Sequence, residues 1–347
     1  MVRKTNIIIV GAGFAGLSAL IQLTKSKLNL DIKLFDKDKY FEYTPSLHLY
    51  LSNPRYINKI RISLDKYYSD YFINEEIIKV DADKVHTKEN SYEFDFLVIA
   101  TGSTTNFFNN ESFKKFSNPV KRIKDIIQIN KELEKANSIT VVGGGYTGIE
   151  IASVLATTTN KKINLIHSKH NLLDSVNEDA GIKSRKYLED NELTLFLNDR
   201  VIGCQDNKIT LKSGKELQTD LVIMTAGVRP NDDMLKDQTL NNNLSLKSNL
   251  KVFLCGDVAQ SETLSTAHNA MIEGRMVAKE IIASINHVSL PKQEKKDWKI
   301  LAIALGKHNG LITFGKHAIK LPFINFFKWI IEKRIIFEFK NKIQLPI

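Results

Sequence analysis

Short runs of apolar residues alternate with amphipathic segments along the first hundred residues of this 347-residue chain. The run at residues 6–10 predicts a strand, the segment that follows it predicts a helix, and residues 31–35 predict a second strand. Another apolar run, at residues 96–100, ends in Thr101 and Gly102. This order is typical of a βαβ unit with a parallel sheet.

The same order of elements is repeated later in the chain. Residues 138–142 predict a strand, residues 149–157 a helix and residues 163–166 a strand, and an apolar run at residues 221–224 follows. The glycine turns of the two units begin 132 positions apart, at residues 11 and 143, which indicates a duplicated domain and not a solenoid repeat.

A last apolar strand at residues 250–255 and a helix at residues 267–284 follow the second unit. We interpret them as the end of the first domain, which therefore encloses the second. The predicted fold is α/β, with two Rossmann-type dinucleotide-binding domains, the second inserted in the first, and a small C-terminal module. The predicted domains are residues 1–110 with 240–290, residues 111–239, and residues 291–347.

Composition narrows the classes of protein that fit this pattern. A hydrophobic content of 43% is enough for several cores. The two cysteines, Cys204 and Cys255, lie too far apart for a zinc-binding motif. Residues 5–24 are uncharged, but they contain a glycine turn in place of a cleavage site, so we expect a cytoplasmic chain without a signal peptide or membrane span.

The first glycine turn has the chemistry of a dinucleotide site. Gly11, Gly13 and Gly16 form a GxGxxG pattern between a strand and a helix, where the backbone can approach a pyrophosphate and the helix N-terminus favours negative charge. Asp36 follows the second strand, where a carboxylate can accept hydrogen bonds from a ribose. The pattern predicts dinucleotide binding.

The second glycine turn differs at one position that affects coenzyme choice. Gly143, Gly145 and Gly148 repeat the pattern, but the second strand ends in His167 and not in an acid. Without that carboxylate the site should not repel a 2′-phosphate, so NADPH is compatible beside NADH. The alternative is that His167 and the lysine two positions later, Lys169, are solvated loop residues with no part in selectivity.

These motifs together resemble the two-dinucleotide-binding-domain flavoproteins of the glutathione reductase class, also called the pyridine nucleotide-disulfide oxidoreductase superfamily. The resemblance covers residues 1 to about 290 and rests on GAGFAG, FDFLVIATGS, VVGGGYTGIE, TAGVRPN and VFLCGDVA. It implies FAD in the first domain and NADH or NADPH in the second. The implied cofactor-binding residues are Gly11, Gly13, Phe14, Ala15, Gly16, Asp36, Lys37, Ala100, Thr101, Gly102, Gly143, Gly145, Tyr146, Thr147, Gly148, Gly227, Gly256, Asp257 and Thr266.

The resemblance also implies a role for Glu150, one turn into the second helix, near the nicotinamide. The alternative is an exposed helix carboxylate. The segment at residues 264–270 resembles the start of the helix beneath the flavin in type II NADH dehydrogenases, with Ser265 or Thr266 as its cap, Ala267 as its first residue, and His268 as a quinone contact or a structural residue.

The lack of cysteines after the first domain's second strand indicates the class of electron acceptor. Disulfide reductases of this class carry redox cysteines soon after the first domain's second strand, and residues 40–53 contain none. The segment at residues 40–47 instead resembles the matching loop of sulfide:quinone reductases and type II NADH dehydrogenases. The resemblance therefore implies a quinone near Thr44 and Pro45.

The C-terminal region adds charge and an amphipathic helix. Residues 291–347 contain twelve Lys and Arg against four Asp and Glu, which accounts for most of the net charge of +10. Within residues 321–334, large apolar side chains gather on one helical face, and Asn325, Lys328 and Glu332 on another. This pattern favours a peripheral helix on an anionic membrane; packing on the protein's own core or in a homodimer is the alternative.

The sequence therefore predicts an FAD-dependent NAD(P)H:quinone oxidoreductase, peripheral on a membrane, resembling type II NADH dehydrogenases and the ferroptosis-suppressor branch of apoptosis-inducing-factor-like flavoproteins. One alternative is a ferredoxin or rubredoxin reductase. Another is a redox-sensing flavoprotein like the apoptosis-inducing factors. We do not expect nucleic acid as a partner or a metal as a cofactor.

Overall fold

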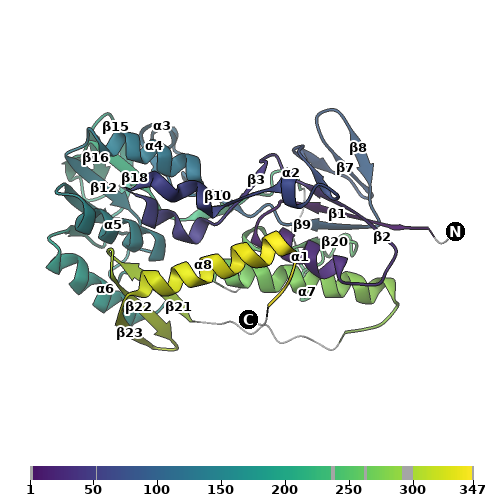
Figure 1. Cartoon of the computed structure of the whole chain (residues 1–347). Coiled ribbons are helices and arrows are strands. Elements are labelled where there is room, and N and C mark those ends of the chain that lie inside the picture. Colours follow the sequence, from purple (N-terminus) through teal and green to yellow (C-terminus); the bar gives the residue numbers. More distant parts are fainter. Residues whose placement is uncertain (1–2, 52, 236–238, 262–263, 291–299, 346–347) are drawn as a thin grey trace.

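The computed structural model describes the chain except residues 1–2, 52, 236–238, 262–263, 291–299 and 346–347. Two five-stranded sheets lie at opposite ends of the molecule, and a long C-terminal helix crosses its front (Figure 1). The first residues of the expected C-terminal module, including Trp298, fall outside the described part.

The first sheet is parallel, with strand order β20-β9-β1-β2-β5. Its strands are β1 (Thr5–Val10), β2 (Leu30–Phe35), β5 (Phe72–Ile73), β9 (Phe96–Ile99) and β20 (Val252–Leu254). In register, Val10 lies opposite Phe35 on one side and Ile99 on the other, so the ends of β2 and β9 flank the turn that follows β1. β20 pairs with β9, which confirms that the chain returns to this sheet after the second one.

Two helices pack closely on this sheet and on each other, α1 (Phe14–Thr24) and α7 (Ala267–Ile285). A Cβ atom on Gly274 would lie 2.1 Å from the carbonyl oxygen of Ala15, so α7 approaches α1 backbone to backbone. The predicted helix at residues 267–284 differs from α7 by one residue.

The second sheet has the order β11-β18-β12-β13-β14 and is also parallel. Its strands are β11 (Asn118–Pro119), β12 (Ser138–Val142), β13 (Lys162–Ile166), β14 (Thr194–Phe196) and β18 (Leu221–Met224). Its helices are α4 (Ile123–Leu133), α5 (Tyr146–Thr158) and α6 (Glu178–Asp190). The fold is thus the predicted α/β architecture, with two similar sheets.

Smaller elements complete the two halves. Antiparallel β10 (Ser103–Thr105) and β19 (Val228–Pro230) link them. The segment after β2 contains β3 (Tyr40–Glu42) and the 3₁₀ helix η1 (Thr44–Tyr50). The other elements are η2 (Pro54–Ile60), β4 (Arg61–Ser63), α2 (Leu64–Tyr67), β6 (Lys79–Val80), β7 (Lys84–His86), β8 (Ser91–Glu93), α3 (Glu111–Phe116), β15 (Val201–Gln205), β16 (Lys208–Leu211), β17 (Glu216–Gln218) and η3 (Asp257–Ala259).

The C-terminal module consists of a three-stranded antiparallel sheet and one long helix. The strands are β21 (Leu301–Leu305), β22 (Asn309–Phe314) and β23 (His317–Pro322), and the helix is α8 (Ile324–Asn341). The sheet packs against α5 and α6, whereas α8 runs from β22 across to α1 (Figure 1). Among the described residues, no helix is long and apolar enough to cross a membrane.

Candidate functional site

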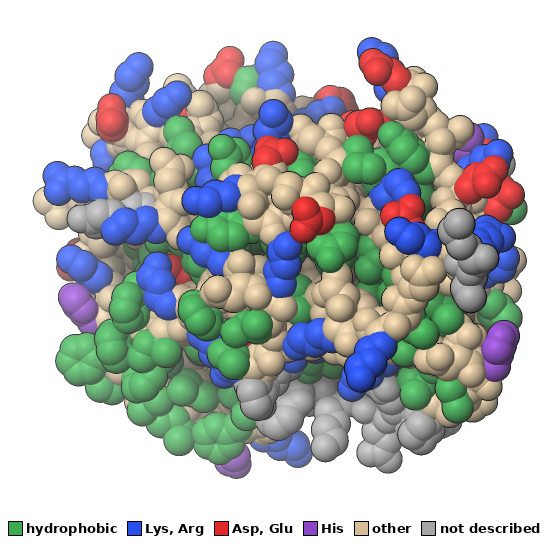
Figure 2. Space-filling view, turned by 45° about the vertical axis from the view of Figure 1, so that its right-hand side comes forward, with side chains coloured by type: hydrophobic (Ala, Val, Ile, Leu, Met, Phe, Trp, Pro, Cys, Tyr) green, Lys and Arg blue, Asp and Glu red, His purple; other side chains and the backbone are tan. Residues whose placement is uncertain are grey.

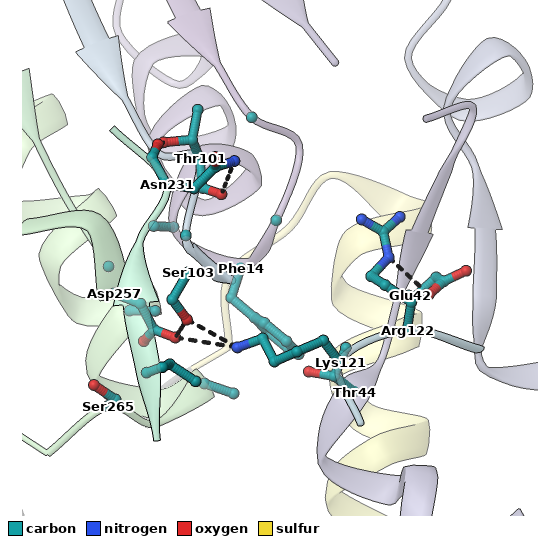
Figure 3. Close-up of a pocket in the computed structure, with 18 of the residues that line it drawn as sticks. Phe14, Glu42, Thr44, Thr101, Ser103, Lys121, Arg122, Asn231, Asp257 and Ser265 are labelled. Carbon is teal, nitrogen blue, oxygen red and sulfur yellow. Dashed lines mark hydrogen bonds and ion pairs between the residues drawn. The ribbon is translucent and has the colours of Figure 1, made fainter. Parts of the chain in front are cut away.

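A cavity of about 700 Å³ lies where the two halves meet η1, the start of α7 and α8. Its size is in the range of cofactor and ligand clefts. Figure 3 shows part of its wall, with side chains from both halves pointing toward the same space. Most of the predicted site residues line it: Gly11, Gly13, Phe14, Ala15, Asp36, Lys37, Thr44, Pro45, Ala100, Thr101, Gly102, Tyr146, Thr147, Glu150, Gly227, Gly256, Asp257, Thr266 and Ala267.

The first glycine turn has the geometry of a phosphate cradle. Gly11 has φ +102°, which favours glycine, and a Cβ atom on Gly16 would lie 1.9 Å from the Gly11 carbonyl oxygen, so the helix packs tightly on the turn. A Cβ atom on Gly13, by contrast, would have no neighbour within 4 Å. The space beside Gly13 is therefore open to a ligand at the N-terminus of α1.

Asp36 fixes this turn from the end of β2. Its Oδ2 accepts a hydrogen bond of 2.7 Å from the backbone N–H of Ala12, and its Oδ1 accepts one from Asp38. Burial raises the pKa of the Asp36 carboxyl above its usual value, although the two backbone N–H groups oppose this shift. The carboxylate thus lies at the cavity wall in the place predicted for a ribose-binding acid.

A second polar cluster of the cavity lies around Asp257. The hydroxyl of Ser103 donates a 2.7 Å hydrogen bond to Asp257, and Lys121 Nζ donates one of 2.8 Å to Ser103 (Figure 3). Lys121 Nζ is also 3.8 Å from Asp257 Oδ2. Burial lowers the pKa of the Lys121 amine. The sequence identified Asp257 but not its two partners.

The turns that follow β9 and β18 are tied together beside the cavity. Thr101 Oγ1 donates a 2.6 Å hydrogen bond to the carbonyl oxygen of Asn231, and the Asn231 N–H donates one of 3.0 Å to the carbonyl oxygen of Gly102. These two turns belong to the motifs ATGS and TAGVRPN, one from each unit. The contact holds the two halves in a fixed relation next to the site.

The second glycine turn has the same backbone geometry as the first. Gly143 has φ +117°, a Cβ atom on Gly148 would lie 1.9 Å from the Gly143 carbonyl oxygen, and a Cβ atom on Gly145 would meet nothing within 4 Å. These three glycines, and Gly16 of the first turn, do not line the main cavity. The open space at Gly145 therefore lies outside the main cavity. The next two residues, Tyr146 and Thr147, do line that cavity.

Glu150 is buried, which excludes the alternative of an exposed helix carboxylate. Its Oε1 accepts hydrogen bonds from Lys328 Nζ and from the backbone N–H of Ala304, and its Oε2 lies 3.3 Å from His48 Nδ1. Burial alone would raise the pKa of the Glu150 carboxyl, but His48, Lys328 and the Ala304 amide together lower it below its usual value. Burial lowers the pKa of His48 to about 4, so at neutral pH the cluster consists of a carboxylate, an ammonium group and a neutral imidazole.

The start of α7 forms another part of the wall. The Thr266 hydroxyl accepts a hydrogen bond of 3.2 Å from the N–H of Asn269, which confirms the predicted helix cap. Thr266 and Ala267 line the cavity, so the positive end of the helix dipole faces it. His268, for which the sequence left a quinone contact and a structural role open, does not line the cavity, and burial lowers the pKa of its imidazole.

Four site residues escaped the sequence analysis: His48, Ser103, Lys121 and Lys328. The only signal for Lys328 was its place on the polar face of an apolar helix, and that face turns out to point into the protein and not into solvent. Lys121 precedes a helix and His48 lies four positions after Thr44, with no motif that marks either side chain. Their contacts join residues far apart in sequence.

The two cysteines behave as expected from the sequence. Both are free and buried, and burial raises the pKa of the Cys204 thiol to about 11 and that of Cys255 further. Neither is the exposed thiolate that disulfide exchange requires. Within the described residues, no group of three or more potential metal ligands is present.

The residues of the first half fit FAD. An open space at Gly13, a carboxylate at Asp36 and a second polar cluster at Asp257 lie along one continuous cavity, as a long dinucleotide with ribose and ribityl hydroxyls requires. The second half repeats the turn for another dinucleotide, with the carboxylate replaced by His167.

Comparisons with known proteins agree with this geometry. The chain is 26% identical over 350 residues to apoptosis-inducing factor homolog B of Dictyostelium discoideum, with 89% of each chain covered. It is 25% identical over 390 residues to the type II NADH:quinone oxidoreductase of Staphylococcus haemolyticus, with 96% of each covered.

Solved structures show the same fold. NDH2 from Plasmodium falciparum, solved in complex with NADH, superposes with a TM-score of 0.82 at 17% identity, over 98% of this chain and 96% of that one. The sulfide:quinone oxidoreductase from Aquifex aeolicus superposes with a TM-score of 0.83 at 18% identity, over 99% and 93%. The model of the family described as pyridine nucleotide-disulphide oxidoreductase matches residues 5–274. The chain therefore belongs to the pyridine nucleotide-disulphide oxidoreductase family.

Proposed function

We propose that this chain is an FAD-dependent oxidoreductase that takes hydride from NADH or NADPH and passes the electrons to a quinone. In this proposal, residues 1–110 and 240–290 hold FAD, residues 111–239 hold the nicotinamide coenzyme, and residues 291–347 form the membrane-facing module. The observation that carries it is the single cavity that runs from the first glycine turn past Glu150 to Thr44 and Pro45.

The acceptor end of the cavity favours a quinone over a disulfide. The chain contains two cysteines, both free and buried, so it lacks the dithiol that disulfide reduction requires. Besides Thr44 and Pro45, the wall of the cavity includes apolar side chains such as Leu47 and Leu301. A flat, largely apolar acceptor with polar edges suits such a wall. The type II NADH:quinone oxidoreductases among the relatives support the same acceptor.

FAD supplies the chemistry of accepting a hydride and releasing two electrons, and the protein positions the reactants and adjusts the local charge. The start of α7 directs the positive end of its dipole into the cavity, where it stabilises negative charge. Lys328 Nζ donates a hydrogen bond to the Glu150 carboxylate at the wall and adds a positive charge there. Thr44 and Pro45, which begin η1, limit the space for the acceptor.

Stopped-flow kinetics test the proposal directly. FAD-loaded protein is mixed with NADH or NADPH, and the reduced protein is then mixed with a water-soluble short-chain ubiquinone or menaquinone analogue. We expect rapid loss and rapid recovery of the flavin absorbance. Rapid loss with slow recovery would reject the quinone and point to a ferredoxin-like acceptor or a redox-sensing role.

A pair of variants locates the acceptor. Thr44→Phe narrows the proposed quinone end and should slow only the recovery phase. Ile202→Phe is the control, because Ile202 is an exposed apolar residue on β15 that does not line the cavity. Equal effects of both variants on recovery would reject Thr44 as part of the quinone site.

We further propose that the protein binds peripherally to an anionic membrane, on its cytoplasmic side, through the outer face of α8. Phe326, Phe327, Trp329, Ile330 and Ile331 on this face are between 44% and 56% exposed. Figure 2 shows hydrophobic side chains gathered at its lower left, with Lys and Arg side chains nearby. Soluble monomers rarely expose such a group of large apolar side chains.

Charge favours an anionic surface. Residues 300–345 contain two acids, Glu332 and Glu338, and both are at most 2% exposed, whereas Lys316, Lys320 and Arg334 are exposed. Basic groups around an apolar helix face are typical of helices that lie on anionic bilayers.

Flotation with vesicles containing phosphatidylglycerol tests this binding. The double variant Phe326→Ser/Phe327→Ser should lose most of it, and Ile182→Ser should not, because Ile182 is an equally exposed apolar residue on α6. A wild-type protein that forms a homodimer and does not float would reject the membrane in favour of a second copy of the chain.

A further inference from the structure

Helix α8 buries three charged side chains and exposes several large apolar ones. Lys328, Glu332 and Glu338 point into the protein, with side chains 11%, 1% and 3% exposed. The opposite face presents Phe326, Ile330 and Phe337 to solvent. The helix therefore connects an apolar outer surface with a polar interior along its length.

The inner face of α8 completes the cluster at Glu150. Three separate segments meet there, because His48 comes from η1, Glu150 from α5 and Lys328 from α8. All three side chains are nearly buried, at 4%, 8% and 11% exposure. If α8 moved away, Glu150 would keep the Ala304 amide but lose the ammonium group that neutralises it. A buried carboxylate without its cation is costly, so the site depends on the position of α8.

The far end of α8 is attached to the FAD half. Tyr68 donates a 2.6 Å hydrogen bond to the carbonyl oxygen of Phe339, and the Phe339 ring packs edge-on against Phe41 at 5.1 Å between centroids. Gln344 donates a hydrogen bond to the carbonyl oxygen of Ser18 in α1. Phe41 lines the main cavity, so both ends of the helix contact the site or its wall.

The outer surface is not limited to the helix. Phe314 and Ile319, on the β22–β23 hairpin, are 42% and 48% exposed, and Phe323 between the hairpin and α8 is 64% exposed. Ile324 at the start of α8 contacts the hairpin's own sheet at Gly310. A flat bilayer can bind the hairpin and the helix together only while α8 lies in this position, because the two surfaces are then presented jointly. The membrane therefore has a higher affinity for the arrangement with α8 docked, and that difference shifts the equilibrium toward it.

We propose that membrane binding and assembly of the Glu150 cluster are coupled through α8, so that an anionic bilayer activates the enzyme. Lys328 acts as the positioning residue that transmits this effect, because it lies on the inner face of the helix whose outer face meets the lipid. This inference rests on the proposed quinone reductase activity and on the proposed membrane surface, and it adds regulation of that same site.

The test measures quinone reduction with a water-soluble quinone analogue, so that vesicles do not merely deliver the acceptor. In the wild type, anionic vesicles should raise kcat about fivefold or more, in the range of ordinary allosteric coupling. Phe326→Ser/Phe327→Ser should lose both vesicle binding and activation. Lys328→Met should keep vesicle binding but lose activation. Lys279→Met, which changes an exposed lysine of α7 outside the Glu150 cluster, should behave as the wild type.

Hydrogen exchange gives a second readout that does not depend on turnover. Vesicles should slow exchange of the amides of α5 around Glu150 in the wild type and in Lys279→Met, but not in Lys328→Met. Vesicle binding without activation and without this protection would overturn the coupling, as would equal activation of Lys328→Met. If vesicles did not bind, both the coupling and the proposed membrane surface would be overturned. If no condition gave quinone reduction, the proposed function would be rejected, and the hydrogen-exchange result would decide the coupling.

Discussion

The two glycine turns differ in the side chain that closes each of them. In the first, the carboxylate of Asp36 accepts the N–H of Ala12 at 2.7 Å. In the second, Nδ1 of His167 accepts the N–H of Gly144 at 3.1 Å. Asp36 directly follows β2 and His167 directly follows β13, so the two groups occupy equivalent places. The fold thus requires a hydrogen-bond acceptor here, but it does not require a negative charge.

The replacement also specifies the protonation state of His167. An imidazole whose Nδ1 accepts a hydrogen bond must be unprotonated at that nitrogen, and its Nε2 lies 3.4 Å from Asp174 Oδ1. Burial lowers the pKa of His167, which favours the neutral form. The second site therefore presents a neutral group where the first presents a carboxylate, and this explains why a 2′-phosphate would meet no repulsion from it.

The largest expected effect tests which half holds which dinucleotide. Gly13→Val places a side chain in the open space of the first turn and should abolish FAD retention. Gly145→Val does the same in the second turn and should leave FAD bound while it slows reduction by NADH about a hundredfold, as the loss of a phosphate site implies. Both positions have extended backbone that accepts valine.

The measurements are the flavin absorbance per protein after gel filtration and the stopped-flow reduction rate. Circular dichroism checks that both variants fold. If Gly145→Val lost its flavin and Gly13→Val kept it, the assignment of the two halves would be reversed.

The next effect concerns coenzyme choice. His167→Asp restores the carboxylate in the second turn and should raise the Kd for NADPH about tenfold or more through repulsion of the 2′-phosphate, with less than about a threefold change for NADH. His167→Asn is the matched control, because its amide oxygen can still accept the Gly144 N–H without a charge. If the Kd for NADPH divided by the Kd for NADH were the same in His167→Asp as in the wild type, this position would not select the coenzyme.

A smaller effect is expected when the charge is removed from the first turn. Asp36→Asn keeps an acceptor for the Ala12 N–H but loses the charge-assisted hydrogen bonds to the ribose, so the Kd for FAD should rise about fivefold. Titration of apoprotein with FAD measures it. An unchanged Kd would mean that Asp36 stabilises the turn alone and does not contact the cofactor.

The smallest effect is a pH dependence at mildly acidic pH that only the second turn should show. Protonation of His167 removes its acceptor, and because burial lowers its pKa, the loss begins below the ordinary value of 6.5. The Kd for NADH should therefore rise as the pH falls from 8 to 5.5, by no more than about fivefold. Fluorescence titration in wild type and His167→Asn tests this, since the variant should show a flat profile. The same slope in both proteins would assign the effect to another group.

Local sequence was enough to place the elements of both halves. The strands predicted at residues 138–142 and 221–224 agree with β12 and β18, because continuous apolar runs bounded by glycine or polar residues are specific for buried parallel strands. The second helix was predicted to start at residue 149, but α5 starts at Tyr146 with Gly145 as its N-cap. The difference arises because the glycine turn and the first helical turn share residues, which the apolar pattern does not reveal.

The amphipathic C-terminal helix shows where pattern alone was insufficient. The sequence correctly placed the large apolar side chains of residues 321–334 on one face, and Lys328 and Glu332 on the other. Periodicity says which residues share a face but not which face is buried, and here the polar face meets the protein. The reason is a buried carboxylate at Glu150, 178 positions away, which pairs with the lysine.

By itself the sequence determined the two dinucleotide folds, their glycine turns, the acid at Asp36 and its replacement by His167, because each depends on residues within about thirty positions of one another. Only the tertiary structure decided that His48 and Lys328, and not His268, meet at Glu150. That cluster joins three segments that no local pattern relates. Its members are held together by burial and charge pairing. These interactions act between neighbours in space and produce no periodic pattern in the sequence.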